Sequence, residues 1–261
     1  MSENPLINNI KIPGEIIRLP SLGLFYDNGE LNENVQNGEV EVFPMSAFDE
    51  IAMRNIDHII NGTSITEVFS RCIPAIKKPA DLFGKDVDHL LLVLRRITYG
   101  PNIEVSYTHS CETAQEHRYK IDITEVINNT RNIDPTTITA LYSVTMDNGQ
   151  LVELRPVRFK DIVTIMQESK NFSTTPLYEI QQKLVESTIS IIHSVDGDTD
   201  KKHIYEWASA IPAPWFKKIS AALDAGNNWG PDSTHTVECQ DCHQPMTVEL
   251  PLNPLTFFLD Y

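Results

Sequence analysis

The chain has 261 residues, a formal net charge of −15, a pI near 4.9 and 41% hydrophobic residues. This length and apolar content suffice to bury a core, whereas the negative charge argues against binding to nucleic acid or to anionic membranes, whose phosphates would repel it. No stretch is apolar over the roughly 20 residues that cross a bilayer, and the first residues lack the apolar core of a signal peptide. We therefore expect a protein that is made and kept in a reducing cytoplasm.

The first hundred residues predict an extended arm followed by a strand and helices. Residues 1–26 form the arm, because they begin with a polar stretch and end in "LPSLGLFY", a proline-bearing apolar segment that we expect to contact a partner. Residues 27–101 form a strand and helical region, with an alternating strand over 38–45. Ser46 is the expected N-cap of the helix that follows. Three helices are predicted here, over 46–62, 65–73 and 83–100.

Residues 102–160 form the first hairpin region. Two alternating strands around a polar tip are predicted over 102–123. A second hairpin follows, and its turn is expected at Asn148-Gly149, because this dipeptide favours the tight turns that join antiparallel strands.

The last hundred residues predict helices and then one more hairpin. Residues 161–230 form a helical region, in which 176–195 and 201–226 read as helical. Residues 231–261 hold a C-x-x-C hairpin and an apolar tail, and we expect this hairpin to pack with 102–123. The predicted fold class is therefore α+β, in which helical segments pack with antiparallel hairpins, including a degenerate zinc-ribbon-like pair of hairpins.

The two cysteine-bearing hairpins share a plan. "VSYTHSCETAQEHRYKIDI" and "HTVECQDCHQPMTVEL" each contain an alternating strand, a cysteine, a short polar tip and a second alternating strand. In this comparison Cys111 corresponds to Cys239, and Ala114 falls where Cys242 stands. The first hairpin therefore lacks the second cysteine of a complete knuckle.

A zinc ribbon pairs two such knuckles, each of which donates two thiolates or imidazoles to one tetrahedral ion. Zinc is the candidate cofactor here, and Cys111, Cys239 and Cys242 would be three of its ligands. The fourth must come from a histidine, for which the candidates are His109, His117, His235 and His243. We take His117 as the predicted ligand. The alternative, in which the hairpins persist without a metal and the thiols stay reduced, remains open.

Other chemistry fits less well. Cys239 to His243 spell C-x-x-C-H, the haem attachment pattern, but attachment would require export, and strand-like sequence flanks the motif. A thioredoxin-type pair would need a helix after its first cysteine. The acidic turn 195–200 lacks the glycine and the closing acid of a calcium loop. No phosphate loop, nucleophile elbow or H-E-x-x-H motif is present, so we expect neither an enzyme nor a small-molecule substrate.

Several segments together resemble the T4-like bacteriophage baseplate hub proteins. "RLPSLGLFY" and "GEVEVFPMSAFDEIAMRNIDHIINGTSITEVFSRCI" are similar to the N-terminal half of these chains. The cysteine hairpin, the Val-Asp-Gly turn before "IYEWASAIPAPWFKKI" and the final C-x-x-C with "LNPLTFF" also resemble this group. Ala114 departs from relatives that carry two C-x-x-C knuckles, and this departure bears on the metal rather than on the family.

The resemblance implies a non-enzymatic structural subunit of a contractile-tail baseplate hub, made in the host cytoplasm and located in the virion. Its partners would be other hub or tail proteins, with no role for nucleic acid, membrane or small-molecule substrate. Two alternatives stay open: a hub-assembly chaperone that is not retained in the virion, and a zinc-ribbon metalloprotein of another function.

The C-terminal segment "LPLNPLTFFLDY" concentrates apolar side chains that must dock, either on the protein's own hairpins or on a neighbouring subunit. Replacing Phe257 and Phe258 by alanine distinguishes these possibilities. An intramolecular lid predicts a lower melting temperature of the isolated protein, since a buried Phe contributes roughly 1.5–3 kcal/mol. A subunit contact predicts an unchanged melting temperature and lost assembly. If both properties stay at wild type, neither account of these phenylalanines holds.

Overall fold

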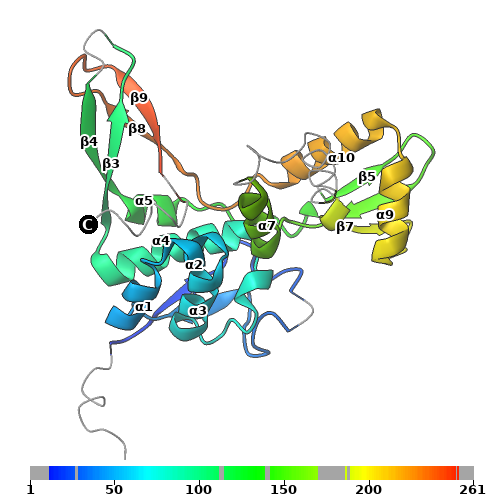
Figure 1. Ribbon diagram of the computed structural model, residues 1–261, viewed down its shortest axis with the longest axis horizontal. Helices are drawn as coiled ribbons and strands as arrows, with labels where there is room; N and C mark the ends of the chain where they lie inside the picture. Colours follow the sequence, from blue (N-terminus) through cyan, green and yellow to red (C-terminus); the bar gives the residue numbers. More distant parts are fainter. Residues whose placement is uncertain are drawn as a thin grey trace, which may run out of the picture.

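The computed structural model describes residues 12–26, 29–111, 115–138, 142–169, 186, 189–250 and 252. Short helices and four small antiparallel sheets make up this part of the chain, which confirms the predicted α+β class (Figure 1). Most of its buried apolar side chains fall into two clusters, called here the first core and the second core. None of the helices in the described ranges is both long and apolar enough to cross a bilayer.

The first core lies among the N-terminal helices and a two-stranded sheet. Strand β1 (Glu15–Arg18) pairs antiparallel with β2 (Glu39–Val42), and the apolar faces of α3 (Thr63–Cys72) and α4 (Gly84–Tyr99) complete the core. The helix predicted over 83–100 is α4, and its Leu90 and Leu94 side chains are both fully inaccessible. A short 3-10 helix, η2 (Pro79–Asp81), leads into α4.

Ser46 caps the first helix as predicted. Its hydroxyl accepts from the Asp49 N–H, and the Asp49 carboxylate accepts from the Ser46 N–H in return. The expected single helix over 46–62 is instead two helices, α1 (Ala47–Ala52) and α2 (Ile56–Ile60). The division arises because the Asn55 side chain accepts from the His58 N–H and so starts a second helix.

The N-terminal segment differs from an extended arm over its described part. Residues 12–26 contribute β1 and then a turn that is buried in the protein, where Leu19 and Ser21 are 0% exposed. The Tyr26 hydroxyl donates to the Asp86 carboxylate at 2.6 Å and accepts from the Phe83 N–H at 2.8 Å. The other Asp86 oxygen accepts from the Ser21 N–H at 2.9 Å. The apolar residues of "LPSLGLFY" are therefore held by the chain's own core.

The second core packs helices on a three-stranded sheet of order β5 (Ser143–Thr145), β6 (Leu151–Leu154) and β7 (Ile192–Val195). The predicted hairpin at Asn148-Gly149 is confirmed by the pairing of β5 with β6. Helices α9 (Lys201–Ala210), α10 (Ala213–Gly226) and α7 (Phe159–Ser169) lie in this half of the chain.

Two details of the helical prediction are wrong. Residues 192–195 form strand β7 rather than the end of a helix, because Ile192 and Val195 bury their β-branched side chains while the backbone pairs with β6. The expected helix over 201–226 is broken between α9 and α10, because Pro212 forces Ile211 into an extended conformation.

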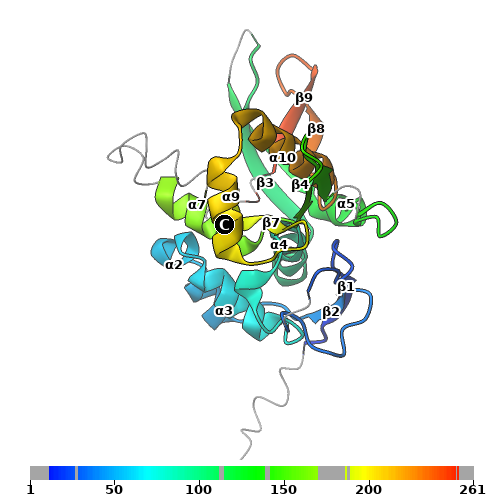
Figure 2. The same ribbon diagram turned by 90° about the vertical axis from the view of Figure 1, so that its right-hand side faces the viewer.

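The two cysteine hairpins lie side by side at one end of the molecule (Figures 1 and 2). The first consists of β3 (Asn102–Thr108) and β4 (Glu116–Asp122), which leads into α5 (Ile123–Asn128). The second consists of β8 (Thr234–Glu238) and β9 (Pro245–Glu249). Their inward residues, Val105, Tyr119, Met246 and Val248, belong to the first core. Leu250 is also buried there, whereas Phe257 and Phe258 lie outside the described residues.

Tyr26→Phe tests whether the N-terminal segment is locked to α4. The change removes one hydroxyl and leaves a buried carboxylate oxygen and the Phe83 N–H without that partner, which costs about 1–3 kcal/mol each. We expect thermal unfolding to show a fall in melting temperature of roughly 4–24 °C, at about 2–4 °C for each kcal/mol. The matched control is Tyr205→Phe, at an exposed tyrosine, which should unfold like wild type. An unchanged melting temperature for Tyr26→Phe would mean that this segment does not depend on the hydroxyl.

Candidate metal centre

The tip of the C-terminal hairpin is a compact knuckle. The Cys239 N–H donates to the Gln244 carbonyl, and the His243 N–H donates to the Cys239 carbonyl, both at 3.0 Å. His243 has a φ of 57°, which turns the backbone into β9. The Gln244 N–H is hydrogen bonded to the Cys242 sulfur. These bonds place the two thiols of the C-x-x-C motif on one side of the tip.

The first hairpin presents a different pair of side chains at its tip. Strand β3 ends at Thr108, and the Cys111 N–H then donates to the His109 carbonyl at 2.9 Å. This tight turn brings His109 and Cys111 to the same place above the strands. Residues 112–114, including Ala114, lie outside the described residues.

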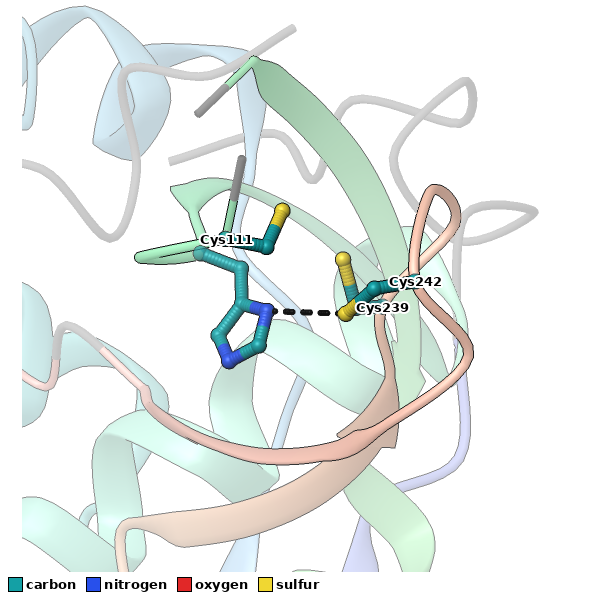
Figure 3. A group of neighbouring side chains, drawn as sticks. Cys111, Cys239 and Cys242 are labelled. Carbon is teal, nitrogen blue, oxygen red and sulfur yellow. Dashed lines mark hydrogen bonds between the residues drawn. The ribbon is translucent and has the colours of Figure 1, made fainter. Parts of the chain in front are cut away.

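The two tips meet (Figure 3), where the labelled cysteines approach one another from the two hairpins. The ligand atoms of His109, Cys111, Cys239 and Cys242 all lie within 4.8 Å of one another. The Cys242 sulfur lies 3.2 Å from His109 Nδ1. Around a tetrahedral zinc ion, ligand atoms stand about 3.5–3.8 Å apart, given Zn–S near 2.3 Å and Zn–N near 2.0 Å. The cluster could therefore bind a metal ion such as zinc after only small movements of the side chains.

The structure brings together the three cysteines of the predicted site but places the predicted histidine elsewhere. His117 Nε2 lies 2.8 Å from the Asp241 carboxylate, so this ring bridges β4 to the opposite knuckle instead of joining the sulfurs. His243 contacts Glu238 at 2.8 Å, and His235 stands opposite Val248 within the β8–β9 ladder. The histidine of the cluster is His109. The signal for it in the sequence is its position two residues before Cys111, in the turn rather than in a strand.

Electrostatics within the cluster favours a cation. The pKa of the Cys242 thiol is raised: the Gln244 N–H lowers it, but partial desolvation and the neighbouring Cys239 and Cys111 sulfurs outweigh that effect. Thiolates so close repel one another, and a bound divalent ion would remove the repulsion. Cys72 has a different environment, since burial raises its pKa to about 12 and keeps it an unreactive core thiol.

The cluster also indicates what kind of metal site it could be. Four protein side chains fill a tetrahedral coordination sphere, whereas catalytic zinc sites keep one position open for water or substrate. Cys239 is fully buried and the other three residues are partly buried. This arrangement suits an ion that joins two segments of chain, not one that activates a substrate.

The His117–Asp241 contact is a second polar link between the two hairpins, and its strength can be measured. Both side chains are about one-fifth exposed, at 19% and 21%, so solvent partly screens the energy of their contact. We expect a double-mutant cycle with His117→Ala and Asp241→Ala to give a coupling free energy of at most about 1 kcal/mol in chemical unfolding. A coupling of several kcal/mol would make this pair, and not the sulfur cluster, the principal polar link between the hairpins.

The comparison with known proteins identifies a family. Residues 51–259 match the family model described as T4 bacteriophage base plate protein. No curated protein and no solved structure matches the chain. The matched range contains every residue of the candidate metal centre, the second core and most of the first core. The chain belongs to the T4 bacteriophage base plate protein family.

Proposed function

We propose that this protein is a structural subunit of the hub of a contractile-tail phage baseplate and that it acts through protein–protein assembly in the virion. Its partners are other hub or tail proteins. Family membership supports a baseplate role, and the resemblance of the N-terminal half supports the hub in particular. The charge of −15 is consistent with protein partners and unfavourable for nucleic acid.

The observation that carries this proposal is the closed ligand set at the hairpin tips. His109, Cys111, Cys239 and Cys242 converge without leaving a coordination position for a substrate, which favours a structural role over a catalytic metalloprotein. Zinc is the metal that we propose for this centre. A fixed pair of projecting hairpins gives a subunit a defined surface to present to its neighbours.

Exposed apolar side chains on the N-terminal half support contacts with such neighbours. Phe48 and Ile51 on α1 are both 68% exposed, and Ile16 on β1 is 70% exposed. Isolated exposed apolar residues are common, but two on one short helix form a patch that a partner subunit can cover. The Arg71 guanidinium, which is ion-paired with Asp49, lies 5.3 Å from the Phe48 ring centroid at the edge of this patch.

The test is quantitative mass spectrometry of purified tails and particles. A structural subunit is present in a fixed ratio to other baseplate proteins. The double variant Phe48→Asp with Ile51→Asp should reduce its incorporation at least tenfold, because two charges would be desolvated in the contact. Its melting temperature should stay near that of wild type, because both side chains are exposed.

The matched control is Tyr205→Asp, which puts one charge at an exposed site on α9 and should not change incorporation. Absence of the protein from particles, together with failed tail assembly when it is deleted, would instead support the hub-assembly chaperone. Normal incorporation of the α1 variant would remove this helix from the contact surface.

A further inference from the structure

The knuckle of the second hairpin and the turn of the first meet at a single point, although they are separated by 133 positions in the sequence. We propose that His109, Cys111, Cys239 and Cys242 bind one Zn²⁺ ion, and that this ion fixes the C-terminal hairpin on the β3–β4 hairpin. The inference deepens the proposed function, because it concerns the hairpin pair on which that function rests. It is tested by metal analysis of the purified protein, whereas the proposed function is tested by incorporation into particles, so failure of one can be distinguished from failure of the other.

The donor set selects the metal. Three sulfurs and one imidazole nitrogen in a tetrahedral arrangement are typical of structural zinc, whereas calcium and magnesium require oxygen ligands. Cys239 is fully buried, so the ion would sit at the boundary of the first core, sheltered from solvent on that side. Each of the four side chains offers one ligand atom, and four ligands complete one tetrahedral coordination sphere, which suits a single ion rather than a metal cluster.

His109 compensates for the incomplete first knuckle. Ala114 stands where the sequence comparison requires a second cysteine, and alanine has no ligand atom. His109 lies on the other side of Cys111 along the chain, and its Nδ1 is 3.2 Å from the Cys242 sulfur. The first hairpin therefore contributes a His-x-Cys pair and the second a Cys-x-x-Cys pair to the same centre.

The two hairpins form separate sheets, so a metal ion held by both would strengthen their attachment to each other. The four strands do not join into one sheet: β3 pairs with β4, and β8 pairs with β9, as two separate ladders in the described chain. Polar contacts between the two hairpins include the Gln240 amide donating to the Arg118 carbonyl at 2.9 Å and the Glu249 N–H donating to the Tyr107 hydroxyl at 3.3 Å. Two-stranded hairpins are marginally stable by themselves. An ion with ligands from both tips would add a cross-link to these hydrogen bonds and to the shared apolar contacts.

Metal analysis and cobalt substitution of the purified full-length protein test the ligand set. We expect one zinc per chain and, after exchange with Co²⁺, an absorption spectrum with the charge-transfer bands of thiolate ligands. His109→Ala should weaken Co²⁺ binding by more than the roughly 10–100-fold that loss of a second-shell partner costs. His109→Cys should keep the metal but shift the spectrum to that of four sulfur ligands.

His117→Ala is the matched control, since it removes a histidine from the same hairpin that lies outside the cluster. It should keep one zinc per chain and an unchanged cobalt spectrum. Loss of metal in His117→Ala but not in His109→Ala would overturn the assignment of His109. Three results would overturn the zinc site. They are purified protein that binds neither zinc nor Co²⁺, purified protein that contains iron instead, and a disulfide between Cys239 and Cys242 in freshly isolated protein.

Hydrogen exchange tests the role of the ion. Removal of zinc by a chelator should accelerate exchange of the β8 and β9 amides at least about tenfold, while the amides of α3 and α4 keep their protection. Restoring zinc should restore protection in wild type but not in His109→Ala. Equal protection of β8 and β9 with and without zinc would show that the ion does not hold the hairpin in place.

Discussion

The return of the C-terminal hairpin to the first core is the constraint on which the arrangement of this protein depends. The chain builds most of that core before residue 127, then supplies the second core, and comes back at Cys239 to contribute Met246, Val248 and Leu250. Bringing the ends of so long a chain segment together has a loop-closure entropy cost that grows slowly with the length of the segment. Contacts between the C-terminal hairpin and the first core must offset this cost. Those contacts are the apolar side chains of the returning hairpin, its hydrogen bonds to the β3–β4 hairpin and the four-residue cluster at the tips.

A second tie joins the two cores near the N-terminus. Tyr26 packs against both clusters, and its ring stacks on Phe83 with a centroid distance of 4.6 Å. Phe83 in turn meets the Trp229 ring edge to face. The hydrogen bonds of Tyr26 to Asp86 and Phe83 leave little freedom for this segment. Together the returning hairpin and the Tyr26 contacts hold segments from both ends of the described chain in fixed relative positions.

Much of this organisation could be predicted from local patterns. Period-two alternation identified β2 and the strands of both cysteine hairpins, and Asn148-Gly149 identified the β5–β6 turn. The similarity between the two hairpins indicated that they belong together. Local patterns failed where tertiary pairing decided the outcome: Ile192 and Val195 fit a helix as well as a strand until β6 pairs with them.

The histidine of the cluster also could not be identified from local sequence patterns alone. Alternation in β4 places His117 on the inward face with Tyr119 and Ile121, which makes it the natural choice for a ligand. The opposing residue on that face is Asp241, and their hydrogen bond was not predictable from either hairpin alone. His109 follows the last residue of β3, where strand alternation no longer fixes the direction of a side chain. Its role depends on a turn geometry that only the structure reveals.

The most direct test of this account is X-ray absorption spectroscopy at the zinc edge on the purified full-length protein. A zinc ion held by His109, Cys111, Cys239 and Cys242 predicts a first shell of three sulfurs at about 2.3 Å and one nitrogen at about 2.0 Å. A first shell of nitrogen and oxygen scatterers alone, or protein that carries no zinc, would contradict the claim that a metal ion fixes the returning hairpin.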